Sequence, residues 1–189
     1  KVMASEKKIV KYIDLPIQHA SDRILKLMNR RYRKKDIVAL INKLRKRAPG
    51  IAIRTSLIAG FPGETAADFN ELKSFVKEMK FDRLGVFPYF REAGTSAARL
   101  KGQVSEKVKK ARARQLMRLQ ARVSLEKHRA LVGQTLAVLV EGKNVGRTYR
   151  DAPDIDGKVH LKGRPPKTGQ MIKARVIKAK TYDIISRSN

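Results

Sequence analysis

The order of apolar segments in the first half of the chain is the feature that most constrains the fold. Short apolar segments typical of strands are predicted at residues 9–17, 51–59 and 84–89. Between them lie segments with apolar residues at helical spacing, which begin at Ser21, Lys34 and Thr65. Ser21 and Thr65 are the predicted caps of the first and last of these helices. Strands that alternate with helices in this way favour an α/β fold with a parallel sheet.

The second half of the chain shows a different pattern. A long helix is predicted over residues 105–131, and its apolar side is expected to contain Val108, Ala111, Leu116, Leu119 and Val123. Short alternating segments follow Gly133 and are separated by Gly, Pro and Asp. Five such segments predict a small, all-β, antiparallel barrel of the OB-like type. We therefore expect two domains, residues 1–130 and 131–189.

The composition excludes several classes of site. The sequence contains no cysteine, so it has no disulfide framework, no thiolate metal site and no cysteine nucleophile. No apolar run approaches the length of a membrane span. We expect a cytoplasmic, monomeric protein without a membrane partner. The chain begins with Lys1 rather than Met, which suggests a piece of a longer protein.

The charge of the chain is strongly positive. The sequence has 44 Lys and Arg against 17 Asp and Glu, a net charge of +27. Such a field favours a polyanionic partner, usually RNA or DNA. Aromatic residues make up only 6% of the chain, with no Trp, which gives weak support for base-stacking platforms.

Three predicted strand ends carry candidate site residues. They are Gln18-His19, the turn Gly60–Glu64 and the run Phe87–Tyr89. In barrels of parallel strand–helix units, chemistry sits at the carboxyl ends of the strands. Two glycines in the turn would let backbone approach a ligand closely, and free amides after it could meet an oxygen of the ligand. The turn lacks the spacing of a P-loop.

Each of these features also has a purely structural interpretation. The turn could be a tight strand-to-helix connection and nothing more. His19 could line a pocket with Gln18 or be a hydrogen-bonded bystander. Glu64 could be a general base, although a helix-capping role is more common for such a residue. His128 and His160 lie far from His19 in sequence and suggest no metal site.

Three motifs in register resemble the radical SAM methylthiotransferases. They are DLPIQHASDRILKLMNRRY at residues 14–32, RTSLIAGFPGET at 54–65 and FDRLGVFPYFREAGTSAA at 81–98. The family has one type that modifies an aspartate of ribosomal protein twelve of the small subunit and another that modifies tRNA adenosine. Gln18-His19 and YRDAPDIDG at residues 149–157 are similar to the first type.

The resemblance implies a fold and a set of site residues. The first domain would be half of a partial, TIM-like (βα) barrel that binds S-adenosylmethionine, and the second would be a TRAM barrel that holds the substrate macromolecule. The implied cofactor-binding residues are Gln18, His19, Thr55, Ile58, Gly60, Phe61, Gly63, Glu64, Phe87, Pro88 and Tyr89. The implied substrate-binding residues are Tyr149, Arg150, Asp151, Asp154 and Asp156. No catalytic residue or metal ligand is assigned within this chain.

The implied reaction is reductive cleavage of S-adenosylmethionine to a 5′-deoxyadenosyl radical. The radical would take a hydrogen from the β-carbon of the aspartate, where a methylthio group is then installed. The family also implies two 4Fe–4S clusters on cysteine thiolates. We expect those cysteines upstream of this chain, and we expect the chain alone to be inactive.

The positive charge of the chain does not decide between a protein substrate and a tRNA substrate. Ribosomal protein twelve is itself basic, so a basic barrel would repel it. The enzyme could meet ribosomal protein twelve while that protein is bound to ribosomal RNA. Acidic residues upstream of the chain could instead offset its positive charge, or the target could be tRNA. A non-enzymatic RNA-binding module is a third interpretation, but it leaves the three strand ends unexplained.

Overall fold

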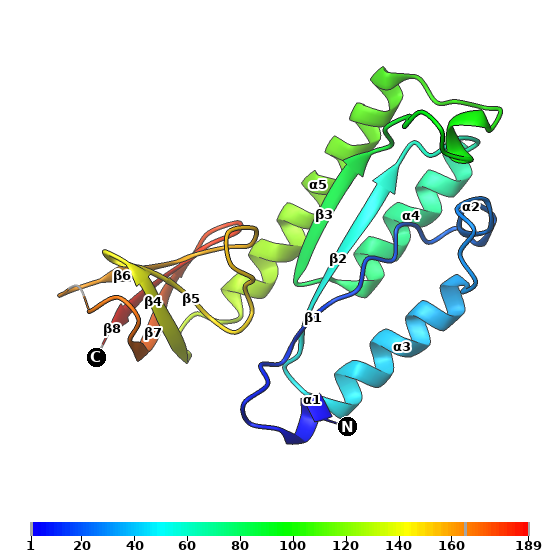
Figure 1. Cartoon of the computed structure of the whole chain (residues 1–189). Coiled ribbons are helices and arrows are strands. Elements are labelled where there is room, and N and C mark those ends of the chain that lie inside the picture. The colour runs from blue at the N-terminus through cyan, green and yellow to red at the C-terminus, as the bar shows by residue number, and fades with distance from the viewer. Residues whose placement is uncertain (1, 165, 189) are drawn as a thin grey trace.

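The computed structural model describes residues 2–164 and 166–188, which form an α/β unit followed by a small barrel (Figure 1). The helices are α1 (Val2–Ser5), α2 (Asp22–Leu27), α3 (Lys34–Arg47), α4 (Ala66–Met79), the 3-10 turn η1 (Ala97–Arg99) and α5 (Glu106–Arg129). The long helix α5 runs along the sheet and leads into the barrel. Among the described residues, no helix has both the length and the apolar character needed to cross a membrane.

Three parallel strands form the sheet of the first unit, which confirms the predicted α/β fold. In sheet order they are β1 (Tyr12–Asp14), β2 (Ala52–Ala59) and β3 (Arg83–Pro88). The first strand is much shorter than the predicted segment 9–17. Pro16 has no N–H to donate, and Gln18 has a positive φ of 66°, so regular pairing ends after Asp14.

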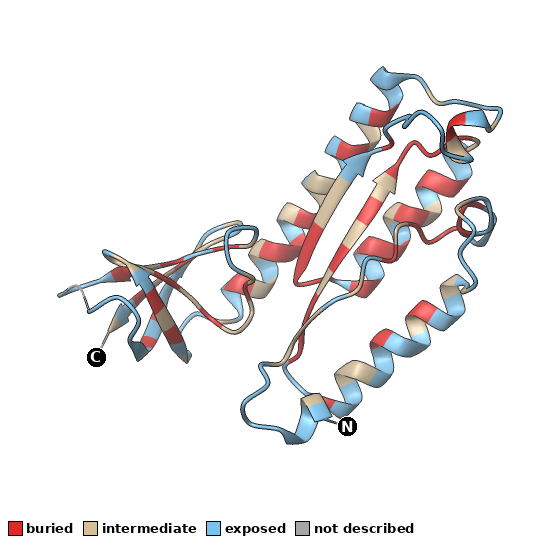
Figure 2. Ribbon diagram, viewed as in Figure 1, coloured by how far each residue is buried: buried red, intermediate tan, exposed pale blue. Residues whose placement is uncertain are grey.

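The core of the first unit lies between the sheet and the helices (Figure 2). Ile53 and Leu57 of β2 are fully buried in this core. Arg54, Ser56 and Ile58, which alternate with them, are only half-buried. Because successive side chains of a strand point to opposite faces, β2 turns one face to the helices and the other away from them. We call this second side of the sheet the open face.

The connection from β2 to α4 contains the capping box that the sequence predicts. The Asp68 N–H donates to Thr65 Oγ1 (3.2 Å), and the Thr65 N–H donates to the Asp68 carboxylate (2.9 Å). Ser21 occupies the predicted cap position of α2, but its side chain makes no capping hydrogen bond. The Ser21 hydroxyl instead donates to Asp68 Oδ1 (2.7 Å) and so ties the starts of the two helices together.

The buried side of α5 is more polar than the sequence predicts. Its buried residues are Lys109, Ala113, Leu116, Gln120, Val123, Ser124 and His128. Leu116 and Val123 agree with the prediction, whereas Val108 is 37% exposed and Ala111 and Leu119 are half-buried. The prediction is partly wrong because polar side chains on this helix bind groups of both units.

The predicted five-stranded barrel is confirmed. Its strands are β4 (Thr135–Gly142), β5 (Val145–Arg147), β6 (Val159–Lys162), β7 (Met171–Ala179) and β8 (Ile184–Ser188). They close in the order β4-β5-β6-β8-β7 around a core that includes Val138, Val140 and Val176. One pair, β6 with β8, is parallel, so the barrel is not wholly antiparallel as predicted. The division at residues 130 and 131 stays a prediction.

Candidate functional site

The structure brings the three predicted strand ends together at the carboxyl edge of the sheet. The Gln18 N–H donates to the Ser56 carbonyl (3.0 Å), and the Gln18 carbonyl accepts from the Ile58 N–H (2.8 Å). On the other side of β2, the Tyr89 N–H donates to the Ala59 carbonyl (2.9 Å). Residues from three distant parts of the sequence therefore share one edge, as expected for ligand binding by parallel strand–helix units.

An apolar surface lies on the open face at this edge. Ile58 and Phe87 are register partners on β2 and β3. Ile58 is half-buried, Phe87 is 56% exposed, and Pro88 beside it is also exposed. A large exposed ring next to an aliphatic side chain is suited to contact a planar group of a ligand.

Phe61 and Tyr89 form a small buried cluster with Ile24 at the same edge. Their ring centroids are 5.2 Å apart in an edge-to-face arrangement. The Tyr89 hydroxyl is buried and has no hydrogen-bond partner among the described residues. A buried hydroxyl without a partner is costly, so this oxygen marks a position where a ligand or water would supply a hydrogen bond.

The room left by Gly60 is occupied by α5 rather than left open for a ligand. A Cβ on Gly60 would lie 2.4 Å from Lys109 Cγ and 3.2 Å from Lys109 Cα. The residue also has a positive φ of 76°, which favours glycine. The abrupt end of β2 therefore makes space for the first turns of the long helix.

Glu64 is turned inward, where its carboxylate anchors the turn. Its side chain is 0% exposed and lies 2.7 Å from the Arg112 guanidinium of α5. Its second oxygen accepts from the Gly60 N–H (2.8 Å). The structure supports neither a general-base role nor a capping role, since the carboxylate is enclosed and Thr65 caps the helix.

His19 is fully buried beside Glu64. Its Nδ1 accepts from the Ser21 N–H (2.9 Å), so the proton of the neutral ring lies on Nε2. Nε2 is 3.3 Å from Glu64 Oε2, although the contact lacks hydrogen-bond geometry. His19 thus faces the chain's own carboxylate, whereas Gln18 beside it remains partly exposed.

Two further predicted residues support the backbone around the edge. Thr55 is buried, and its hydroxyl donates to the Leu15 carbonyl (2.6 Å). The Gly63 N–H donates to the Gly102 carbonyl (2.7 Å), and a Cβ on Gly102 would lie 3.3 Å from the Gly63 backbone. The loop that precedes α5 therefore packs directly on the turn.

Lys109 and Arg112 are site residues that sequence analysis missed. Lys109 is 3% exposed, its Nζ lies 5.1 Å from the centroid of the Tyr89 ring, and it pairs with Glu106 at 2.6 Å. Cations are almost never buried unless they are paired, so nothing in the local sequence distinguishes these two from their exposed neighbours.

We expect the Gly60→Ala variant to be less stable than the unmodified chain by about 2–4 kcal/mol. The methyl group adds the cost of a left-handed residue and of overpacking against Lys109. Urea denaturation followed by circular dichroism measures the difference. Gly94→Ala is the matched control, because Gly94 also has a positive φ but open space around it. A loss no greater than that of the control would contradict this account of Gly60.

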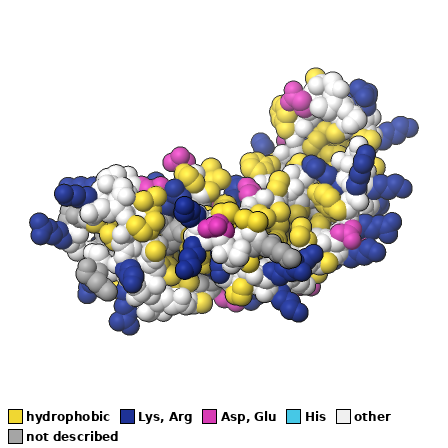
Figure 3. Space-filling model, turned by 60° about the horizontal axis from the view of Figure 1, so that its bottom comes forward, with side chains coloured by type: hydrophobic (Ala, Val, Ile, Leu, Met, Phe, Trp, Pro, Cys, Tyr) yellow, Lys and Arg dark blue, Asp and Glu magenta, His cyan; other side chains and the backbone are white. Residues whose placement is uncertain are grey.

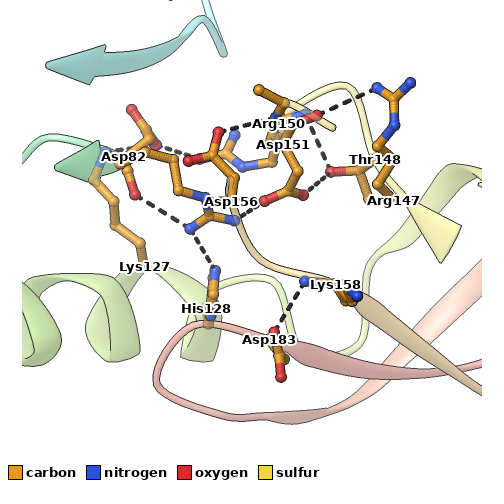
Figure 4. A network of polar contacts seen from close by, with 12 residues as sticks. Asp82, Lys127, His128, Arg147, Thr148, Arg150, Asp151, Asp156, Lys158 and Asp183 are labelled. Carbon is orange, nitrogen blue, oxygen red and sulfur yellow. Dashed lines mark hydrogen bonds and ion pairs between the residues drawn. The ribbon is translucent and has the colours of Figure 1, made fainter. Parts of the chain in front are cut away.

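The predicted substrate segment lies in a second polar network, between the barrel and the α/β unit (Figure 4). We call this network the interdomain clamp. It consists of Asp82, Arg83, Lys127, His128, Arg150 and Asp151. Asp82 Oδ1 lies 2.5 Å from Arg150 and 2.8 Å from Lys127, and Arg83 Nε donates to Asp151 Oδ1 at 2.9 Å.

The neighbouring residues of the segment are also bound within the chain. The Tyr149 hydroxyl donates to the Gly50 carbonyl (2.8 Å). Asp156 accepts from the Tyr12 hydroxyl (2.7 Å), and this hydrogen bond acts with burial, the larger cause, to raise the Tyr12 pKa. Asp154 alone of the five predicted residues is exposed, and its side chain makes no hydrogen bond or ion pair with the described residues. Substrate contact by this segment stays a prediction.

His128, in its neutral form, links Arg83 of the sheet to the Lys180 carbonyl of the barrel. Its Nδ1–H donates to the Lys180 carbonyl (2.9 Å), which leaves Nε2 to accept from Arg83 NH1 (3.1 Å). Burial lowers the pKa of His128, and the charge of Arg83 lowers it further. A protonated ring would place a second cation against the Arg83 guanidinium.

The depressed pKa of His128 predicts a loss of stability in mild acid. The unfolded chain takes up the proton near pH 6.5, whereas the folded chain resists until lower pH. Stability is therefore full above pH 6.5 and falls as the pH drops toward the folded pKa. We expect His128→Gln to reduce the difference in unfolding free energy between pH 7.5 and 5.5 by roughly 1 kcal/mol. An unchanged difference would contradict the neutral assignment.

The chain matches two family models and many curated relatives. Residues 1–76 match the Radical SAM superfamily, and residues 132–188 match the TRAM domain. Proteins named ribosomal protein uS12 methylthiotransferase RimO are 49% identical in Lachnoclostridium phytofermentans, 48% in Pelobacter propionicus and 49% in Clostridium perfringens. These matches cover 97%, 97% and 94% of this chain. Over nearly its whole length, the chain is therefore similar to RimO proteins.

The chain spans 43%, 42% and 41% of the lengths of these three RimO relatives. The radical SAM superfamily, to which RimO proteins belong, uses S-adenosylmethionine and iron–sulfur clusters. The exposed apolar surface and the unpartnered Tyr89 hydroxyl fit a nucleoside. The chain does not fit the cluster, since it has no cysteine and no group of three metal-binding side chains lies within the described residues.

Proposed function

We propose that this chain supplies part of the S-adenosylmethionine site and the substrate-holding barrel of a methylthiotransferase. The substrate would be an aspartate of ribosomal protein uS12, the protein named in the RimO relatives. The observation that carries the proposal is the exposed apolar surface of Ile58 and Phe87 at the carboxyl edge of the sheet. Ile58 also packs against the Ile24, Phe61 and Tyr89 cluster, whereas Phe87 belongs to none of the core clusters of the described residues.

The residues at this edge have distinct roles in the proposed site. Ile58 and Phe87 together contact one side of the adenine, and the partly exposed Gln18 lies at the same edge for polar groups of the cofactor. Glu64 and His19 act behind the surface by holding the turn in place. When bound, S-adenosylmethionine and a reduced 4Fe–4S cluster would supply the radical that removes a hydrogen from the β-carbon of the aspartate. The complete protein would hold two such clusters on cysteines outside this chain.

The interdomain clamp gives the barrel a fixed position relative to the cofactor edge. Proximity and orientation contribute much of the rate of enzymatic reactions, so a rigidly placed barrel would present the aspartate to the site. The exposed Asp154 and the neighbouring Ile155, which is 62% exposed, are the part of the segment open to a partner. The other four predicted residues would act by placing the barrel.

The proposal is tested in the intact enzyme that carries this chain, by equilibrium dialysis with S-adenosylmethionine. We expect Phe87→Ala to raise the Kd about tenfold, because loss of one base-stacking contact costs about 1–3 kcal/mol. Phe90→Ala is the matched control, since Phe90 is 77% exposed but lies beyond the end of β3. An equal Kd for the two variants would contradict the adenine assignment.

The substrate is tested by incubating the same enzyme with uS12 and with tRNA and analysing both by mass spectrometry. We expect the methylthio group on an aspartate of uS12. Transfer to tRNA alone would replace the proposed substrate. The 189-residue chain on its own, reconstituted with iron and sulfide, should form no 5′-deoxyadenosine, because it offers no thiolate.

A further inference from the structure

We propose that a cationic groove between α4 and α5 binds the phosphate backbone of an RNA strand. The groove is a hollow of about 340 Å³ on the outside of the α/β unit. Its lining residues are Lys73, Ser74, Lys77, Gln115, Arg118, Leu119 and Arg122. Four of the seven are cations and none is acidic, so the groove is complementary to an anion.

The four cations form two short rows that face each other across the groove. Lys73 and Lys77 are one turn apart on α4, and Arg118 and Arg122 are one turn apart on α5. Side chains at this spacing are about 5–6 Å apart at Cβ. A nucleic acid strand carries one charge per about 3.4 Å of helix axis, so such a groove faces several phosphates at once.

These cations have no carboxylate partner within the described part of the chain. No ion pair joins any of the four to a carboxylate, and Lys73 only lies over the Phe69 ring at 5.2 Å. Elsewhere α5 does pair its cations, for example Lys109 with Glu106 at 2.6 Å. Like charges one turn apart destabilise a helix by a few tenths of a kcal/mol. Each row therefore places like charges side by side with no carboxylate paired to them.

The wider surface supports a polyanion rather than a small anion. On the face shown in Figure 3, Lys and Arg side chains project from the edges of the molecule with few Asp or Glu among them. A long polyanion can contact several cations of the groove at once, whereas a single phosphate cannot. Leu119 and Gln115 in the groove also offer contacts to sugars and bases.

The choice of RNA rests on the proposed function, because a uS12 substrate occurs beside ribosomal RNA. RNA bound in the groove would also reduce the repulsion between a basic enzyme and a basic substrate, since its phosphates would neutralise part of the positive field of the enzyme. The test below uses neither S-adenosylmethionine nor turnover. Failure of RNA binding is thus distinguishable from failure of methylthio transfer.

The experiment measures binding of the full chain to a labelled single-stranded oligouridylate by fluorescence anisotropy over a range of salt concentrations. The groove variant replaces its four cations with glutamine: Lys73→Gln, Lys77→Gln, Arg118→Gln and Arg122→Gln. Each phosphate contact contributes about 0.7 to the slope of log K against log salt for a single strand. We expect the slope to become shallower by about 3 in the groove variant.

A matched control removes the same charge from the exposed side of α3. Its substitutions are Lys35→Gln, Lys43→Gln, Lys46→Gln and Arg47→Gln, at exposed positions whose side chains make no hydrogen bond or ion pair with the described residues. We expect the slope of this variant to stay unchanged. Equal changes in the two variants would show a diffuse charge effect and overturn the groove, as would no change in the groove variant.

A second arm separates RNA from an acidic protein partner. The same variants are titrated with polyglutamate of equal charge, and the loss of affinity is compared with that for RNA. A larger loss for polyglutamate would assign the groove to an acidic peptide and overturn the proposal. The double variant Lys73→Gln/Arg118→Gln, with an expected slope change of about 1.4, keeps the test decisive if the fourfold variant is poorly folded.

Discussion

Replacing Asp151 with alanine is expected to lower the free energy of unfolding by about 3–5 kcal/mol. Asp151 is 5% exposed and binds the buried Arg83 guanidinium, and it also accepts from the Thr148 hydroxyl at 3.0 Å. Its removal leaves the Arg83 charge buried beside the neutral His128 with no carboxylate partner. Breaking one half of a buried pair is far more costly than losing a surface pair. Urea denaturation with circular dichroism measures the loss.

The same segment offers an internal control for Asp151. Asp154→Ala removes the same chemical group from an exposed position three residues away. We expect it to change stability by no more than about 0.5 kcal/mol. If the two alanine variants unfold at the same urea concentration, the clamp does not hold the barrel to the sheet as described.

Replacing Glu64 with alanine is expected to cost a similar amount, about 3–5 kcal/mol. The carboxylate is the shared acceptor for the Gly60 N–H and the Arg112 guanidinium; the carboxylate is fully buried, and the Arg112 side chain is 13% exposed. In the variant the Gly60 N–H loses its partner, and Arg112 keeps only the Glu64 carbonyl (3.1 Å) and loses its carboxylate. Unsatisfied buried donors carry the full desolvation penalty. The turn beside the apolar surface would loosen, so a weaker affinity for S-adenosylmethionine should accompany the loss in the intact enzyme.

Glu71→Ala serves as the comparison for Glu64. Glu71 also pairs with a cation, Lys34 at 3.2 Å, but its side chain is 39% exposed. Exposed pairs contribute about 0–1 kcal/mol, so a small effect is expected here. A loss at Glu64 no larger than the loss at Glu71 would mean that burial of the anchor has no energetic consequence.

Much of the fold follows from local sequence pattern. The alternation of strand and helix periods gives the α/β unit, and the short alternating segments after Gly133 give the five barrel strands. The Thr65 capping box is visible from two residues three positions apart. Placement of the strand ends at one edge follows from parallel topology alone. These features can be predicted because each depends on residues that are close in sequence or on a general rule of chain geometry.

The parts that sequence could not supply depend on long-range pairs of polar groups. Glu64 resembles an active-site acid in sequence, but Arg112, 48 positions away, encloses it. Gly60 resembles a ligand-binding glycine, but Lys109 fills its space. Asp151 resembles a recognition residue, but Arg83 binds it. Local patterns predict that charged residues are exposed. The buried charges on α5 and in the clamp therefore cannot be predicted from the sequence and are found only in the structure.

The length of α5 fixes the distance and the angle between its contacts with the turn and its contacts with the clamp. It has 24 residues and extends about 36 Å. Arg112 near its start must face the turn, and His128 near its end must face the clamp. An insertion of one residue between these contacts would rotate one of them by about 100° relative to the other. An insertion of seven residues would restore the phase to within about 20° but displace the barrel along the axis. Natural variation in the length of this helix should therefore be rare, and any change should come in whole heptads.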